Sequence, residues 1–193
     1  AVAFCFVYGA ARAVEPVHIF GEIGSTPAVV LIGSCGGISS QVATGDVVVP
    51  ERVAIEESTS AHYALGPVAH ASPGLVERAC GALERRGLRT HRGTTVTTSA
   101  LLTQGPEQVA GWAEAGLLGV DMEASAVYSA AAHFDMGAVA LLFCWDELAR
   151  GRSWLDTFTR EELAAQRAAD LATYDSALEI GCQTAKGEKL SWN

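Results

Sequence analysis

The sequence predicts an α/β fold: a single domain, residues 1–193, with a central twisted mixed sheet flanked by helices. Two patterns support this prediction. Apolar runs of strand length alternate along the chain with segments whose apolar residues recur at helical spacing. The chain also has 193 residues, enough for one domain with a sizeable core, and no repeat or linker divides it.

The first part of the chain is expected to form two strands around one helix. Ala1–Tyr8 is a continuous apolar run, which indicates a buried inner strand. A helix from about Arg12 to Ile23 follows, and Gly24–Pro27 favours a turn. Ala28–Ile32 is a second buried strand. Because a mature protein rarely begins inside a central strand, we expect that sequence upstream of this chain is missing.

The middle of the chain continues the alternation. A turn at Gly45-Asp46 precedes a short apolar strand, Val47–Pro50, and the polar residues after it show no helical stripe. Pro73–Gly87 has an apolar stripe at helical spacing, with Gly87 as the expected C-cap. Thr90–Thr98 is rich in β-branched residues and is expected to be a strand.

The last third supplies two helices and one more inner strand. Pro106–Ala115 is expected to be helical, and Ala138–Cys144 is a continuous apolar run typical of a strand buried on both faces. The tail from Thr159 to about Thr184 is expected to be one long helix. Thr159 is its N-cap, and the acids Glu161 and Glu162 fall in its first turn.

Composition excludes several function classes. The net charge is −9, with 13 basic and 22 acidic residues and no basic cluster, so a nucleic-acid partner is disfavoured. No apolar run approaches the roughly 18 to 20 residues that cross a bilayer, so no membrane partner is expected. The five cysteines have no metal-ligand spacing. They indicate reduced thiols in a cytoplasmic protein, and we expect neither a metal nor a cofactor.

Two carboxylates near the middle of the chain are the first candidates for chemistry. Asp121 and Glu123 flank Met122, and a segment with helical spacing follows them. In an extended segment, side chains two residues apart point the same way. Carboxylates beside a buried helix cost free energy unless a ligand or a donor pairs with them. From spacing alone, an equally good interpretation is that the two acids lie at the start of a helix, where they interact favourably with its dipole.

Two further stretches end predicted strands. Gly33–Gly37 follows one strand, where glycines let backbone amides approach an anion and Ser34 adds a hydroxyl donor. Taken alone, this stretch is more simply an ordinary turn. Asp146 follows Ala138–Cys144, at the edge where α/β sheets bind ligands. Partial desolvation beside Trp145 would raise the pKa of Asp146 toward the range of a general acid. The alternative interpretation is that Asp146 caps a loop.

Together these stretches resemble the nucleoside phosphorylase/nucleosidase family. The matching residues are Gly33–Gly37 followed by Gly45–Val49, then Gly119–Ala124, then Asp146. The resemblance runs from about Phe6 to Asp146. The 23 residues from Glu123 to Asp146 are similar to the spacing in the purine-cleaving branch of the family.

The resemblance implies a small-molecule nucleoside substrate and cleavage of its N-glycosidic bond. Glu123 would hold the 2′- and 3′-hydroxyls of ribose, Met122 would pack under the sugar, and Asp121 would lie beside them. Asp146 would protonate the purine at N7. Ser34 would contact phosphate or the attacking water.

Four more positions complete the implied substrate site. Tyr8 occupies a position near the sugar that is often methionine, and Leu101 lies where an aromatic residue usually covers the base. Gly36 and Trp145 are the other substrate-binding residues that the resemblance implies.

The departures from the family pattern concern the nucleophile. Phosphorylases of the family usually carry an arginine two residues before the Gly-Ser pair, where this chain has Leu31, which cannot pair with phosphate. The family's first strand and early phosphate loop lie upstream of Ala1. We therefore expect water as the nucleophile ahead of phosphate, which stays open as a co-substrate.

The resemblance also implies an assembly and leaves one alternative. Members of this family are dimers, trimers or hexamers, so we expect a homo-oligomer. The alternative to an enzyme is a nucleoside-binding or regulatory homologue with little or no turnover.

Overall fold

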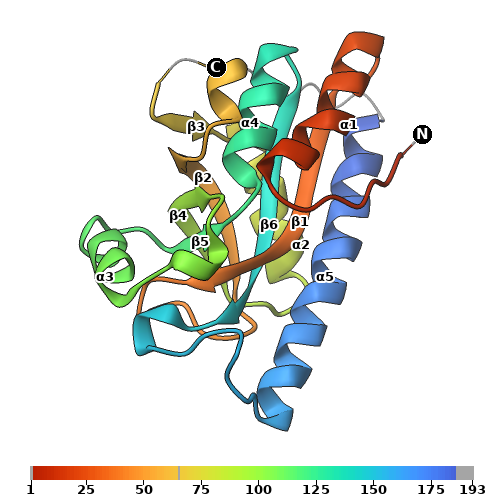
Figure 1. The fold of residues 1–193 in the computed structure, drawn as a ribbon. Coiled ribbons are helices and arrows are strands. Elements are labelled where there is room, and N and C mark those ends of the chain that lie inside the picture. Colours follow the sequence, from red (N-terminus) through yellow and green to blue (C-terminus); the bar gives the residue numbers. More distant parts are fainter. Residues whose placement is uncertain (1, 65, 186–193) are drawn as a thin grey trace.

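The computed structural model describes residues 2–64 and 66–185 and shows a mixed sheet between helices (Figure 1). In chain order the elements are α1 Ala10–Ile23, β1 Ala28–Gly37, β2 Val47–Glu56, the 3₁₀ turn η1 Ser60–His62, β3 Val68–His70, α2 Pro73–Glu84, β4 Thr90–Thr98, η2 Leu101–Thr103, α3 Pro106–Glu114, β5 Gly119–Asp121, α4 Ala124–His133, β6 Gly137–Asp146, η3 Leu148–Arg150 and α5 Arg160–Ala185.

Within the described residues the strands form one sheet in the order β3-β2-β4-β5-β1-β6. β1 is parallel to β6 and antiparallel to β5, whereas β4 is parallel to both β2 and β5. An additional antiparallel pairing joins the start of β2 to the end of β6. Because of this pairing, β2, β4, β5, β1 and β6 close into a ring, which the sequence did not predict.

Helices cover both faces of the sheet. α1 and α4 pack together on one face, and α2 and α5 pack together on the other (Figure 1). β6 lies between these layers and is buried along nearly its whole length. Its alternate residues therefore belong to two different apolar clusters: Ala138, Ala140, Leu142 and Cys144 with α1 and α4, and Val139, Leu141 and Phe143 with α2 and α5.

Most of the predicted elements are confirmed. The expected inner strands Ala28–Ile32, Val47–Pro50 and Ala138–Cys144 lie inside β1, β2 and β6. The cap of α5 is confirmed as well. The backbone N–H of Glu162 donates to Thr159 Oγ1 at 3.2 Å, and that of Thr159 donates to Glu162 Oε2 at 2.7 Å, which is a capping box.

The prediction that Ala1–Tyr8 is a buried inner strand was wrong. Residues 2–8 form no strand and are mostly exposed, with the side chain of Phe6 88% exposed, while Ala1 lies outside the described residues. An apolar run becomes a strand only where a neighbouring strand satisfies its backbone hydrogen bonds. No described strand pairs with this segment.

Two smaller differences have the same kind of cause. β1 is half-buried, although full burial was expected. Among the described residues, its edge opposite β6 pairs with β5 only at Gly36 and Gly37, so the rest of that edge is not covered by a strand. β2 continues past Pro50 to Glu56, because a shift in register between Pro50 and Arg52 keeps it paired with β4.

In the described part of the chain, no helix is both long and apolar enough to cross a membrane.

Candidate functional site

Three segments distant in sequence meet at the end of β1. Gly36 pairs with Val120 of β5 on one side and with Asp146 of β6 on the other. Neighbouring strands are about 4.8 Å apart, so Val120 and Asp146 lie roughly 10 Å from each other across Gly36. Because β5 runs antiparallel to β1, the chain after Val120 turns back toward Ser34. The carboxylate stretch and Asp146 therefore flank the glycine-rich end of β1.

Glycine fits the close approach of these strands. A Cβ atom on Gly36 would lie 2.6 Å from Leu148 Cδ1 and 3.1 Å from Asp146 Oδ1. A Cβ atom on Gly119 would lie 3.2 Å from both Cys35 Sγ and the carbonyl oxygen of Gly36. The missing side chain at Gly36 leaves the space that the carboxyl group of Asp146 faces.

Asp121 is buried, with 3% of its surface exposed, and its side chain caps α4. Thr97 Oγ1 donates to Oδ1 at 2.5 Å, and the backbone N–H groups of Glu123 and Ala124 donate to Oδ2 at 3.1 and 2.6 Å. Burial raises the pKa of Asp121 to about 7, although the bond from Thr97 opposes the shift. Both carboxyl oxygens have internal donors, so Asp121 holds the helix start.

Glu123 lies between the starts of α4 and α1 and is half-buried. The backbone N–H of Gly9 donates to Oε1 at 2.5 Å, and that of Met122 donates to Oε2 at 3.3 Å. Burial raises the pKa of Glu123, and these two bonds oppose the rise. Each oxygen has one internal donor, which leaves further acceptor capacity for a ligand's hydroxyl groups.

Asp146 ends β6 with 5% of its surface exposed. Burial raises its pKa to about 6, against a backbone hydrogen bond from Trp154 that lowers it, and nearby Asp156 adds to the rise. Trp145 next to it is partly exposed and packs against Phe143 and Phe158, with ring centroids 6.0 and 6.3 Å away. A buried carboxyl group with this pKa can hold a proton near neutral pH.

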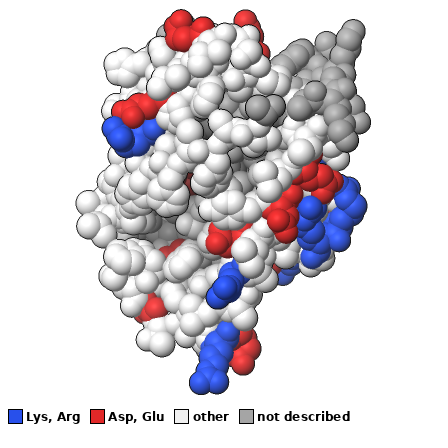
Figure 2. All heavy atoms as spheres, turned by 90° about the vertical axis from the view of Figure 1, so that its right-hand side faces the viewer, with Lys and Arg blue, Asp and Glu red and all other residues white. Residues whose placement is uncertain are grey.

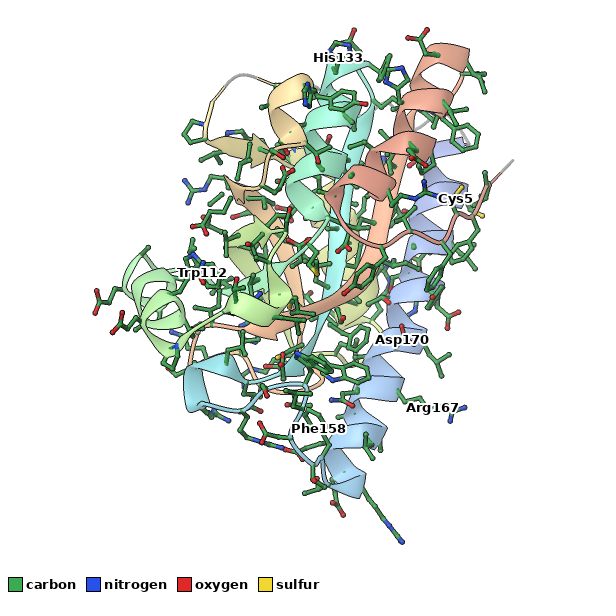
Figure 3. All side chains as sticks on the ribbon, in the orientation of Figure 1. Cys5, Trp112, His133, Phe158, Arg167 and Asp170 are labelled. Atoms are coloured by element: carbon green, nitrogen blue, oxygen red, sulfur yellow. The ribbon has the colours of Figure 1, made fainter. Side chains whose placement is uncertain are left out.

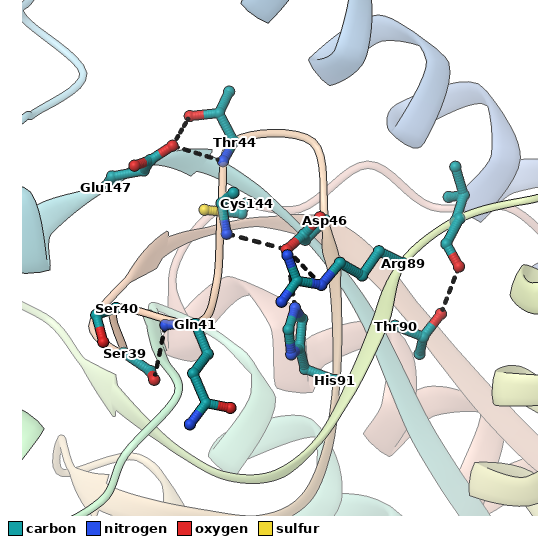
Figure 4. A network of polar contacts seen from close by, with 12 residues as sticks. Ser39, Ser40, Gln41, Thr44, Asp46, Arg89, Thr90, His91, Cys144 and Glu147 are labelled. Carbon is teal, nitrogen blue, oxygen red and sulfur yellow. Dashed lines mark hydrogen bonds and ion pairs between the residues drawn. The ribbon is translucent and has the colours of Figure 1, made fainter.

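The segment after Asp146 is fixed to the loop before β2. Glu147 accepts hydrogen bonds from the backbone N–H of Thr44 at 2.9 Å and from its hydroxyl at 3.1 Å (Figure 4). Glu147 also pairs with Arg150. In the same network His91 and Arg89 contact Asp46 (Figure 4). Sequence reasoning missed Glu147 and Thr44. Neither has a motif signal, because the two partners are 103 residues apart in the chain.

A cavity of about 1500 Å³ opens over these segments. All nine residues predicted from the sequence line it: Tyr8, Ser34, Gly36, Leu101, Asp121, Met122, Glu123, Trp145 and Asp146. The cavity also extends along β1 between α1 and α5 and is mainly apolar there. The nine residues therefore share one cavity. The cavity is large enough that they need not all contact the same ligand.

The ionisable side chains around the cavity are acidic. Asp121, Glu123, Asp146 and Asp170 line it, and no described Arg, Lys or His does. Arg12 follows Gly9 closely in sequence, but its side chain is 72% exposed and pairs with Glu15 at 3.0 Å. Arg167 of α5 points away from the sheet (Figure 3). The molecular face on the side of α5 is mostly uncharged, and its visible basic side chains lie near acidic ones (Figure 2).

Among residues 2–64 and 66–185, no cluster of three or more His, Cys, Asp or Glu side chains is arranged to hold a metal ion.

Comparison with known sequences places this chain in a described family. The family model described as "Phosphorylase superfamily" matches residues 9–174. A DeoD-type purine nucleoside phosphorylase of Roseobacter denitrificans is 32% identical over 126 residues, which cover 63% of this chain and 53% of the relative. A guanosine phosphorylase of Halorubrum lacusprofundi is 32% identical over 111 residues, covering 56% and 46%. The chain thus spans about half the length of the curated relatives it matches.

Solved structures show the same fold. A uridine phosphorylase of Vibrio fischeri superposes with a TM-score of 0.79 at 23% identity, covering 91% of this chain and 71% of the other. A putative methylthioadenosine nucleosidase of Weissella paramesenteroides superposes with a TM-score of 0.72 at 16% identity, covering 92% and 77%. At these identities the likeness concerns the architecture alone.

Proposed function

Because the chain belongs to the phosphorylase superfamily, we propose that it cleaves the N-glycosidic bond of a purine-type nucleoside. The names of the relatives, purine nucleoside phosphorylase and guanosine phosphorylase, support a purine base. The observation that carries the proposal is the double pairing of Gly36, with β5 on one side and Asp146 on the other. This pairing brings Val120, which directly precedes the Asp121–Glu123 stretch, and Asp146 to opposite sides of Gly36, and it supports a substrate site between them.

Glu123 binds the sugar in this proposal. Its carboxylate accepts hydrogen bonds from the 2′- and 3′-hydroxyls of ribose, while the N–H groups of Gly9 and Met122 hold it in place. Met122 packs under the sugar, and Tyr8 lies beside it. Positive charge develops on the ribosyl carbon as the bond to the base breaks, and the nearby carboxylate stabilises that charge.

Asp146 acts on the base. As the C–N bond breaks, its electron pair moves to the purine, and the protonated carboxyl group donates its proton to N7. The raised pKa of Asp146, about 6, supports this role, because the group retains a proton in a useful fraction of molecules near neutral pH. Gly36, Leu101 and Trp145 surround the base.

Water is the favoured nucleophile. A phosphate dianion in a closed cavity needs fixed positive charge, and the described lining offers four carboxyl groups and no basic side chain. Ser34, which is exposed at the cavity, orients the water with its hydroxyl group. The water oxygen bonds to the ribosyl carbon and releases a proton to solvent, from which Asp146 takes up a proton again, so the products are ribose and the free base. Phosphate is the alternative nucleophile and would give ribose 1-phosphate.

The second candidate is a nucleoside-binding homologue without turnover, and the described cavity lining, which holds no basic side chain to bind phosphate, favours it. Release of base from purine nucleosides, measured across a phosphate titration, separates the candidates. We expect base release without phosphate and ribose as the product. Strict dependence on phosphate, with ribose 1-phosphate formed, would refute the choice of water. Nucleoside binding without any base release would refute the enzyme.

A homo-oligomer is part of the proposal. Exposed apolar side chains gather on the N-terminal segment and on α5, including Phe4, Phe6, Leu171 and Leu178. Exposed apolar side chains grouped in this way are typical of an interface. Light scattering on the purified chain measures the mass directly, and a monomer at micromolar concentration would contradict this part.

A further inference from the structure

We infer that Glu57 is a positioning residue for Glu123, acting through the first turn of α4. The inference rests on the proposed function, in which Glu123 holds the ribose. Glu57 follows the end of β2 and is half-buried outside the cavity lining, so it does not reach the substrate itself. Its carboxylate instead accepts hydrogen bonds from two segments that are far apart in the chain.

The carboxylate of Glu57 has four donors. The backbone N–H groups of Thr59 and Ser60 donate to it at 2.5 and 3.1 Å, the hydroxyl of Ser60 donates to Oε1, and the hydroxyl of Ser125 donates to Oε1 at 3.0 Å. Burial acts to raise the pKa of Glu57, but these hydrogen bonds lower it overall. The group is therefore a charged acceptor at neutral pH, and Ser125 is its link to α4.

Ser125 connects Glu57 to the hydrogen bonds at the start of α4. While its hydroxyl is held by Glu57, its backbone N–H donates to Thr97 Oγ1 at 2.9 Å, and the Thr97 hydroxyl donates to Asp121 Oδ1 at 2.5 Å. The other oxygen of Asp121 accepts the N–H groups of Glu123 and Ala124. A continuous chain of hydrogen bonds thus runs from Glu57 to the backbone of Glu123.

Water cannot readily replace these bonds. Ser60, Ser125 and Thr97 are completely buried, and Asp121 nearly so. A hydroxyl group that lost its acceptor there would stay unsatisfied, which is the costly case for a buried hydrogen bond. Three successive N–H groups at the start of α4, those of residues 123–125, are held by this chain of side chains. The direction in which the Glu123 side chain leaves the backbone is set by the same contacts.

The first test is a double-mutant cycle between Glu57→Gln and Glu123→Gln. In the Glu57→Gln variant, an NH2 group replaces one of the two oxygens that accept the N–H groups of Thr59 and Ser60, and the negative charge is removed. The hydrogen bonds of residue 57 are therefore weakened at nearly constant side-chain size. We expect KM for a purine ribonucleoside to rise about tenfold or more with a smaller change in kcat, because sugar binding is what Glu123 supplies. In the Glu123→Gln background, the same change should alter kcat/KM less than about twofold.

Glu107→Gln is the matched control, since Glu107 is an exposed acid in the first turn of α3. It should leave kcat, KM and the melting temperature unchanged. Full additivity of Glu57→Gln and Glu123→Gln would overturn the inference. So would a Glu57→Gln variant with lowered thermal stability but wild-type KM and kcat in its folded fraction, because a purely structural residue behaves in that way.

A second readout does not depend on activity. Amide hydrogen exchange over residues 119–128 should become about tenfold faster in Glu57→Gln, while α2 stays unchanged. Ser125→Ala removes only the link to α4 and should give the same result if Glu57→Gln does not fold. Glu57→Asp keeps the charge and should restore part of the protection. Unchanged exchange over residues 119–128 would overturn the inference, whereas a wild-type chain that turns over no purine nucleoside would refute the proposed function instead.

Discussion

The pH dependence of turnover is expected to come from Asp146. Burial raises the pKa of its carboxyl group from 3.8 to about 6. A rise of about two units corresponds to roughly 3 kcal/mol that disfavours the ionised form. At pH 7, about one carboxyl group in 11 carries its proton at the raised pKa, against about one in 1,600 at the ordinary value. Burial thus supplies about 150 times more of the acid that the leaving base requires.

The assay is kcat/KM for a purine nucleoside between pH 5 and 9. For the wild type we expect a plateau at low pH and a tenfold fall per pH unit well above pH 6, because only protonated Asp146 can act as the acid. Asp146→Asn should lower kcat by about 10²- to 10⁴-fold and remove that descending limb. Nucleoside binding should change much less, because the proton moves mainly in the transition state.

Asp156→Asn is the control for this experiment. Asp156 adds to the raised pKa of Asp146, so its removal should move the descending limb to slightly lower pH without abolishing turnover. An Asp146→Asn enzyme with unchanged kcat would refute the reasoning. A descending limb that persisted in Asp146→Asn would show that another group supplies the proton.

Three more predictions concern the residues around this acid. Glu123→Gln should weaken ribonucleoside affinity more than tenfold, since it weakens two charge-assisted hydrogen bonds of about 1.5 to 3 kcal/mol each, and should leave 2′,3′-dideoxynucleoside affinity unchanged in calorimetry. The pKa of Asp121 is raised to about 7, so its stabilising effect is complete below pH 4 and is lost as pH rises through 7. Wild-type stability should therefore fall by up to about 4 kcal/mol between pH 4 and 8, and Asp121→Asn, measured by urea unfolding, should show a much flatter profile. Gly36→Ala should lower the free energy of unfolding by about 1 to 3 kcal/mol in the same assay and should also lower turnover. The reason is that its Cβ atom would lie 2.6 Å from Leu148 Cδ1 and 3.1 Å from Asp146 Oδ1. Wild-type turnover in this variant would contradict the close packing.

Elements whose signals are local were predictable from the sequence. β6 is apolar on both faces and is buried between two helical layers, as its continuous apolar run indicates. The capping box of α5 links residues three apart, so the chain itself contains the whole signal. The order and spacing of the Gly33–Gly37 stretch, Glu123 and Asp146 were sufficient to indicate the family, and all three line one cavity.

Features that depend on distant partners were not predictable in this way. The apolar run at residues 2–8 resembles an inner strand, but a strand also needs a neighbour to pair with. The spacing of Asp121 and Glu123 left open whether they bind a ligand or lie at a helix start. In the folded chain Asp121 accepts hydrogen bonds from the N–H of Ala124, at the start of α4, and from Thr97, 24 residues earlier in the chain. The link between Glu57 and Ser125 spans 68 residues and has no motif.

The sequence by itself determined the alternation of strands and helices, the ends of most of them and the order of the three candidate stretches, because propensity, periodicity and capping act over a few residues. The tertiary structure alone decided how those stretches are used. Pairing in the ring of strands puts Gly36 between Val120 and Asp146, and burial then changes what each carboxyl group can do. Asp121 becomes a cap, the pKa of Asp146 is raised, and Glu123 retains acceptor capacity for a ligand, because desolvation and hydrogen-bond partners depend on segments that meet only in the folded chain.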